Sequence, residues 1–87
     1  MNNIVEVIWE DAWSESAGLR QEAIDNLEPI IRRNVGYLTK KDKKVVVLSA
    51  GVVEKGSGDS DTFSDNVVIP CGMIKQPIRY LKDNGNI

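Results

Sequence analysis

The sequence predicts a small, mostly-β domain. Short segments rich in β-branched and aromatic residues recur along the chain, and clusters of Gly, Pro, Asn, Asp and Ser separate them. The 87 residues correspond to one domain, and a chain of this size has a marginal hydrophobic core. We expect residues 1–82 to form the domain and residues 83–87 to form a polar tail.

The first strand is predicted to begin at Ile4 and to end near Asp11. Every second residue is apolar, which is typical of a strand with one buried face. The residues of the apolar parity are Val5, Val7, Trp9 and Trp13.

A short amphipathic helix of about two turns is predicted after Gly18, with Leu19, Ala23, Ile24 and Leu27 at helical spacing. It should end before Pro29. Because so short a helix is not stable alone, we expect it to pack on the sheet. An ordered loop over residues 14–28 is the alternative interpretation.

The middle of the chain predicts a β-hairpin. Its strands are Ile30–Leu38 and Val45–Val53, and the polar residues Lys40–Lys44 form the turn. Gly36 lies inside the first of these strands and suggests a bulge or a sharp bend there.

Residues 54–66 lack periodicity and are expected to form a flexible loop. A short fourth strand, Val67–Ile69, is followed by a tight turn over Cys71–Ile74 and by a fifth strand, Pro77–Leu81. We predict a five-stranded SH3-like barrel as the fold class. The elements follow one another in the order of that barrel: a strand, a hairpin, a strand, a tight turn and a short last strand.

Composition weighs against catalysis. The chain has no histidine and one cysteine, Cys71, so it lacks both an internal disulfide and the usual general acid–base group. No phosphate loop, metal motif or nucleophile elbow is present. We predict a binding protein that is not an enzyme and that uses no metal and no cofactor.

Charge and hydropathy narrow the partners. A net charge of −2 makes nucleic acid an unfavourable partner. The apolar runs are too short for a membrane span, and the first residues do not resemble a signal peptide, so a cytoplasmic location without membrane contact is expected. A small domain without disulfide or metal often gains stability by oligomerisation, which favours a homo-oligomer.

Aromatic and cationic side chains supply the candidate binding site. Trp9 should belong to the core, whereas Trp13 lies beyond the first strand and is a candidate for an interface. Neighbouring residues Arg32 and Arg33 must point to opposite faces of their strand, so one of them could meet a phosphate or carboxylate group. The complete predicted ligand-binding set is Trp9, Trp13, Arg32, Arg33, Tyr37, Lys75 and Arg79.

Three parts of the chain resemble a family of small proteins of unknown function from tailed phages and prophages. They are residues 5–12, residues 34–38 before the Val-rich strand, and Ile69–Ile74 before residues 78–81. The resemblance implies a phage accessory protein that acts in the host cytoplasm. By analogy with phage proteins that blunt host defence, it could sequester a small anionic, nucleotide-like immune signal. The alternative is a protein–protein module that inhibits a host protein or serves phage assembly.

Overall fold

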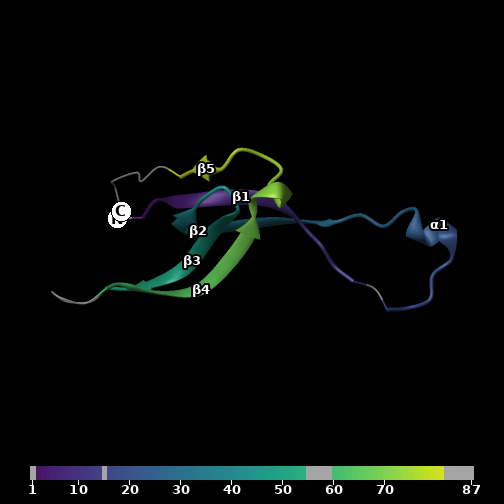
Figure 1. Cartoon of the computed structure of the whole chain (residues 1–87), viewed down its shortest axis with the longest axis horizontal. Coiled ribbons are helices and arrows are strands. Elements are labelled where there is room, and N and C mark those ends of the chain that lie inside the picture. The colour runs from purple at the N-terminus through teal and green to yellow at the C-terminus, as the bar shows by residue number, and fades with distance from the viewer. Residues whose placement is uncertain (1, 15, 55–59, 82–87) are drawn as a thin grey trace.

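Five antiparallel strands form one sheet in the computed structural model, which describes residues 2–14, 16–54 and 60–81 (Figure 1). The strands are β1 (Ile4–Asp11), β2 (Ile30–Lys41), β3 (Val45–Val53), β4 (Thr62–Pro70) and β5 (Arg79–Tyr80), and their order in the sheet is β4-β3-β2-β1-β5. A 3-10 turn, η1 (Cys71–Met73), joins β4 to β5. The mostly-β prediction is confirmed. The sheet is open, because β4 and β5 form its two edges within the described residues.

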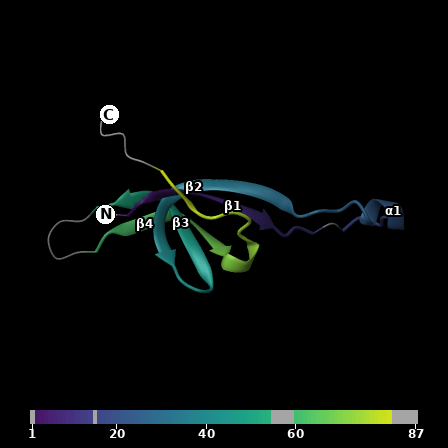
Figure 2. The same ribbon diagram turned by 90° about the horizontal axis from the view of Figure 1, so that it is seen from above.

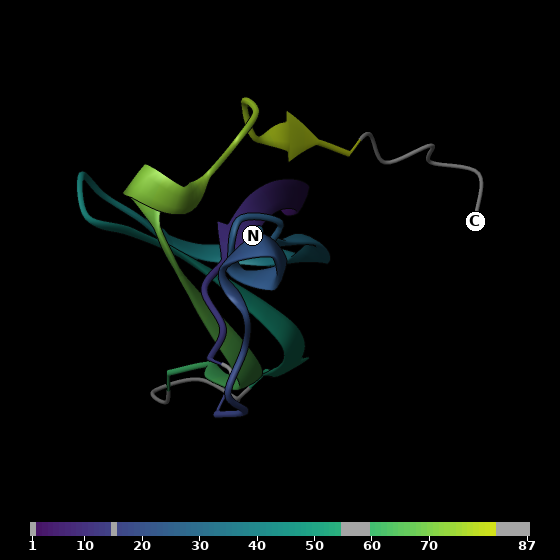
Figure 3. The same ribbon diagram turned by 90° about the vertical axis from the view of Figure 1, so that its right-hand side faces the viewer.

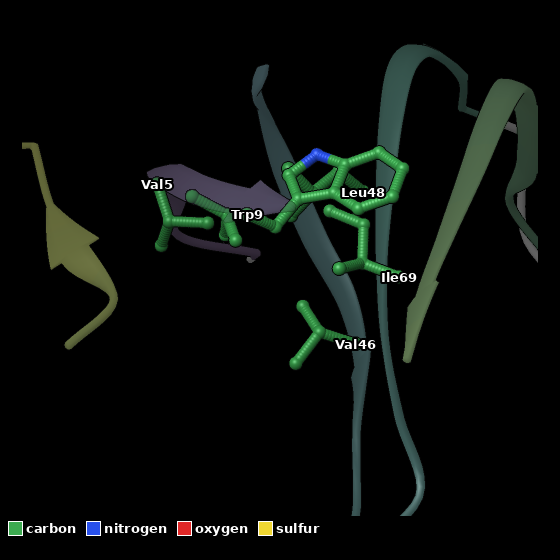
Figure 4. Packing of buried hydrophobic residues seen from close by; sticks show 6 residues of the cluster. Val5, Trp9, Val46, Leu48 and Ile69 are labelled. Carbon is green, nitrogen blue, oxygen red and sulfur yellow. The ribbon is translucent and has the colours of Figure 1, made fainter. Parts of the chain in front are cut away.

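One face of the bent sheet carries the core. Alternate residues of β1 point to this face, and they meet side chains of β3 and β4 in a cluster formed by Val5, Val7, Trp9, Val46, Leu48 and Ile69 (Figure 4). Burial of each such side chain contributes about 1.5–3 kcal/mol. The Trp9 indole N–H donates to Asn34 Oδ1 at 2.7 Å, so the ring is buried with its polar atom satisfied. The prediction that Trp9 belongs to the core is confirmed.

The bounds of β1 and β3 agree with those predicted, but the irregularity in β2 lies elsewhere. The register between β2 and β3 shifts between Leu38 and Lys40, whereas Gly36 pairs regularly with Val5. The expected bulge at Gly36 is therefore wrong. Glycine is needed there for another reason, because a Cβ atom would lie 2.9 Å from the Ser49 carbonyl oxygen on the neighbouring strand.

β4 is longer than predicted. Residues 62–66, expected to belong to a loop, pair with the end of β3, where Thr62 lies opposite Val53. Their strand character is hidden in the sequence because backbone pairing at an edge needs no apolar alternation. The rest of the predicted loop, residues 55–59, and the predicted tail lie outside the described residues. The tight turn at Cys71 is confirmed, and β5 is shorter than expected.

Residues 12–14 and 16–29 project from the sheet as an arm, which Figures 1 and 2 show extending far beyond the ends of β1 and β2. The molecule measures 59 × 27 × 26 Å, and its radius of gyration of 17.3 Å exceeds the value of about 12 Å expected for a compact chain of this length. The arm carries a single helical turn, α1 (Gln21–Ile24). Viewed along the long axis, it stands in front of the sheet and does not lie across it (Figure 3).

A short helix between β1 and β2 is thus confirmed, but its predicted length of two turns and its predicted packing on the sheet are wrong. No residue of α1 is buried, and the apolar side chains of this segment face Trp13 within the arm itself. Neither described helix is long and apolar enough to cross a membrane.

Candidate functional site

An open pocket of about 540 Å³ lies within the arm. The two extended halves of the arm are held together by the Trp13 indole N–H, which donates to the Glu28 carbonyl oxygen at 2.7 Å. The pocket is lined mainly by apolar side chains, those of Ala12, Trp13, Ala17, Leu19, Ile24, Leu27 and Pro29, with Glu28 at its edge. It has the apolar lining and single polar anchor that are usual in binding sites.

The arm exposes apolar side chains that a monomer normally buries. Trp13 is 42% exposed and Leu27 is 44% exposed. The others on the arm and its root are Leu19, Ile24, Ile30 and Ile31. Contiguous apolar surface of this kind marks an interaction site more often than isolated surface leucines do.

The arm is acidic as well as apolar. Within and beside α1 it carries Glu22, Asp25 and Glu28 against the single cation Arg20. Gln21 Nε2 donates to Asp25 Oδ1 at 2.7 Å, which holds that carboxylate on the helical turn. A surface complementary to the arm would therefore combine apolar groups with positive charge.

The outer face of β1, opposite the core, gathers several of the predicted cations. Arg33 Nη1 lies 3.5 Å from Glu6 Oε2, and Arg79 Nη1 lies 3.5 Å from Glu6 Oε1. The Glu6 side chain is only 12% exposed, whereas both guanidinium groups are largely exposed. Two cations on one carboxylate leave this position with excess positive charge.

Lys75 and Tyr37 lie on the same side of β1. Lys75 Nζ is 3.2 Å from Glu10 Oε1, and Tyr37 pairs with Ile4 at the other end of the strand. Of the predicted ligand-binding set, Arg33 and Arg79 thus meet at Glu6, whereas Lys75 and Tyr37 lie on the same face towards opposite ends of β1.

The other members of the predicted set lie elsewhere. Trp9 faces the core on the opposite side of the sheet. Trp13 belongs to the arm pocket. Arg32 lies opposite Trp9 in the register and forms an ion pair with Asp11 at the root of the arm. Ligand binding by these residues stays a prediction.

A second apolar surface, which sequence reasoning missed, lies on the outer face of β2, β3 and β4. Lys40, Val47 and Val68 form one cross-strand row, and Val45 and Pro70 form the next. Val68 is 58% exposed. We call these five residues the lysine face, because it adjoins the turn that also carries Lys41, Lys43 and Lys44.

Asp42 orders that turn. Its Oδ1 atom accepts hydrogen bonds from the backbone N–H groups of Lys44 and Val45, both at 2.8 Å. The two bonds hold the pKa of the Asp42 carboxyl below its usual value of 3.8, and the bond from Val45 has the larger effect. The lysines beside it are therefore presented on a fixed turn.

Among the described residues, no group of three His, Cys, Asp or Glu side chains is placed to hold a metal ion. Comparisons with protein-family models, with curated proteins and with solved structures found no significant match to this chain.

Proposed function

We propose that the protein is a non-catalytic interaction module that binds a protein partner through the arm. The observation that carries the proposal is the apolar pocket around Trp13, on an element that contributes nothing to the core and exposes large apolar side chains. Keeping such a surface in water is unfavourable unless a partner covers it. The acidic residues Glu22, Asp25 and Glu28 require that partner to be basic and apolar.

A pair of amphipathic helical peptides tests this function directly. One peptide consists of leucine and lysine, and the other has glutamate in place of lysine, so that shape and apolar area are matched and charge is reversed. Calorimetry should show that the lysine peptide binds at least about tenfold more tightly than the glutamate peptide, as expected when like charges face each other at an interface.

The binding should depend on the arm. Trp13→Ala should weaken the lysine peptide at least about tenfold, because an exposed aromatic anchor is removed. Tyr80→Ala is the matched control, since Tyr80 is an aromatic residue with a similar exposure of 49% on β5. Equal affinity for both peptides, or an equal loss in the two variants, would contradict the proposed function.

A second candidate function is the capture of a small anion on the outer face of β1. Its support is the convergence of Arg33 and Arg79 on the single carboxylate of Glu6. A phosphate group that approached this position would meet two exposed guanidinium groups. Calorimetry with linear and cyclic nucleotides tests it. Arg33→Ala should abolish the heat of binding, and no heat from the folded wild-type protein would exclude this candidate.

The remaining parts of the proposal rest on strand order and on resemblance. We propose that the order β4-β3-β2-β1-β5, with η1 before the last strand, corresponds to an open form of an SH3-like barrel. We further propose that the protein is a phage accessory factor of the host cytoplasm. In that setting, a host protein or a phage assembly component would be one partner of the protein.

A further inference from the structure

The arm and the lysine face have complementary chemistry within one chain. The arm presents an apolar surface next to Glu22, Asp25 and Glu28. The lysine face presents Val47 and Val68 next to Lys40, at the turn that carries three further lysines. Each surface therefore has the apolar and ionic character that the other requires.

The arm does not reach this face within its own molecule. Figures 1 and 2 show the arm extending away from the strands, with α1 at its far end. Both surfaces are exposed at once, as the exposed side chains of Trp13 on the arm and Val68 on the lysine face show. A second copy of the chain can place its lysine face against the arm of the first, which the first molecule cannot do within itself.

We propose that the arm of one copy docks on the lysine face of a second copy, and that the two copies exchange arms reciprocally. The proposal rests on the proposed function, since it names the protein partner of the arm as the chain itself. Two such contacts related by a two-fold axis close the assembly as a dimer. Each contact buries exposed side chains of both surfaces, among them Trp13, Leu27 and Val68. A chain with so small a core gains stability from that burial.

Charge reversal in two complementary variants tests the arrangement. The first variant carries Glu22→Lys, Asp25→Lys and Glu28→Lys on the arm. The second carries Lys40→Glu on the lysine face and Lys43→Glu and Lys44→Glu on the adjoining turn. The substituted side chains are exposed, and none belongs to the core, so both variants should remain folded.

Sedimentation velocity of the full chain should show a dimer for the wild type. Each variant alone places like charges at both contacts, and its dissociation constant should rise at least about tenfold. In an equimolar mixture both contacts regain opposite charges, so the mixture should form a heterodimer about as tight as the wild-type dimer. Added salt should weaken the wild-type dimer, because the paired charges are solvent-accessible.

Three outcomes would overturn the inference. They are a monomeric wild type at every concentration, variants that each dimerise as the wild type does, and a mixture that stays monomeric. The peptide experiment separates this inference from the proposed function. A monomeric protein whose arm still binds the leucine–lysine peptide in a Trp13-dependent way retains the function and has another partner. In a dimer formed by arm exchange, the same peptide should compete for the arm and dissociate the two copies.

Discussion

At Gly36 the backbone of β2 leaves no room for a Cβ atom beside β3, and replacement of this glycine by alanine tests the packing of the two strands. The added Cβ atom would lie 2.9 Å from the Ser49 carbonyl oxygen and 3.3 Å from Leu48 Cβ. The first contact involves backbone of β3, which cannot move without separating β3 from β2. We expect the free energy of unfolding to fall by about 1–3 kcal/mol, the usual cost of overpacking. The melting temperature should fall by about 4–24 °C.

Urea unfolding followed by tryptophan fluorescence measures this change, because Trp9 is buried in the core. Gly72→Ala is the matched control, since no atom lies within 4 Å of the position of its added Cβ. The control should be neutral or stabilised by up to about 1 kcal/mol, because alanine restricts the unfolded chain. The protein concentration must be the same for all variants, since association would add to apparent stability. If Gly36→Ala were as stable as Gly72→Ala, the close approach of β2 and β3 would be refuted.

Three further predictions concern polar groups. Ser49 is fully buried and its hydroxyl donates to Asn66 Oδ1 at 2.6 Å, so Ser49→Ala should cost about 1–3 kcal/mol in urea unfolding. The pKa of the Asp42 carboxyl is lower in the folded state than its ordinary 3.8, so the ionised carboxylate stabilises the folded protein fully above pH 3.8, and this contribution is lost as the pH falls further through the folded pKa. The urea midpoint should therefore fall more steeply below pH 3.8 in the wild type than in Asp42→Asn. Glu6→Gln removes the shared partner of two exposed cations and should change stability by less than about 1 kcal/mol, while calorimetry should show tighter binding of a nucleotide if that face binds anions.

The sheet was predictable where burial leaves a pattern in the sequence. Val45–Val53 is apolar almost throughout, and the alternation around Val5 and Val7 follows one buried face. The beginning of β4 leaves no such pattern. Its residues pair through backbone at an edge of the sheet, and their side chains are mostly exposed.

The arm was only partly predictable for a different reason. Helical spacing of Leu19, Ile24 and Leu27 shows that these side chains share an apolar neighbour, but it does not identify the neighbour. In the structure that neighbour is Trp13, across the arm, and not the sheet. The same ambiguity affects every amphipathic segment that is too short to be stable alone.

The lysine face shows how far a candidate site can depend on register. The lysines between Lys40 and Lys44 read as a solubilising turn in the sequence. The irregularity between Leu38 and Lys40 places Lys40, and not Lys41, opposite Val47 on the outer face. Since a shift of one residue moves a side chain to the other side of a sheet, composition alone cannot assign that lysine to an apolar surface.

The six buried core residues lie before residue 10 or after residue 45, and no described residue of the arm belongs to the core cluster or packs against it. The arm begins and ends at adjacent strands, where Asp11 pairs with Ile30. Its sequence can therefore diverge while the sheet keeps its packing. Under the proposed function, partner choice and folding are encoded in separate segments of a very short chain. An arm of different sequence grafted onto this sheet would then carry its own recognition properties with it.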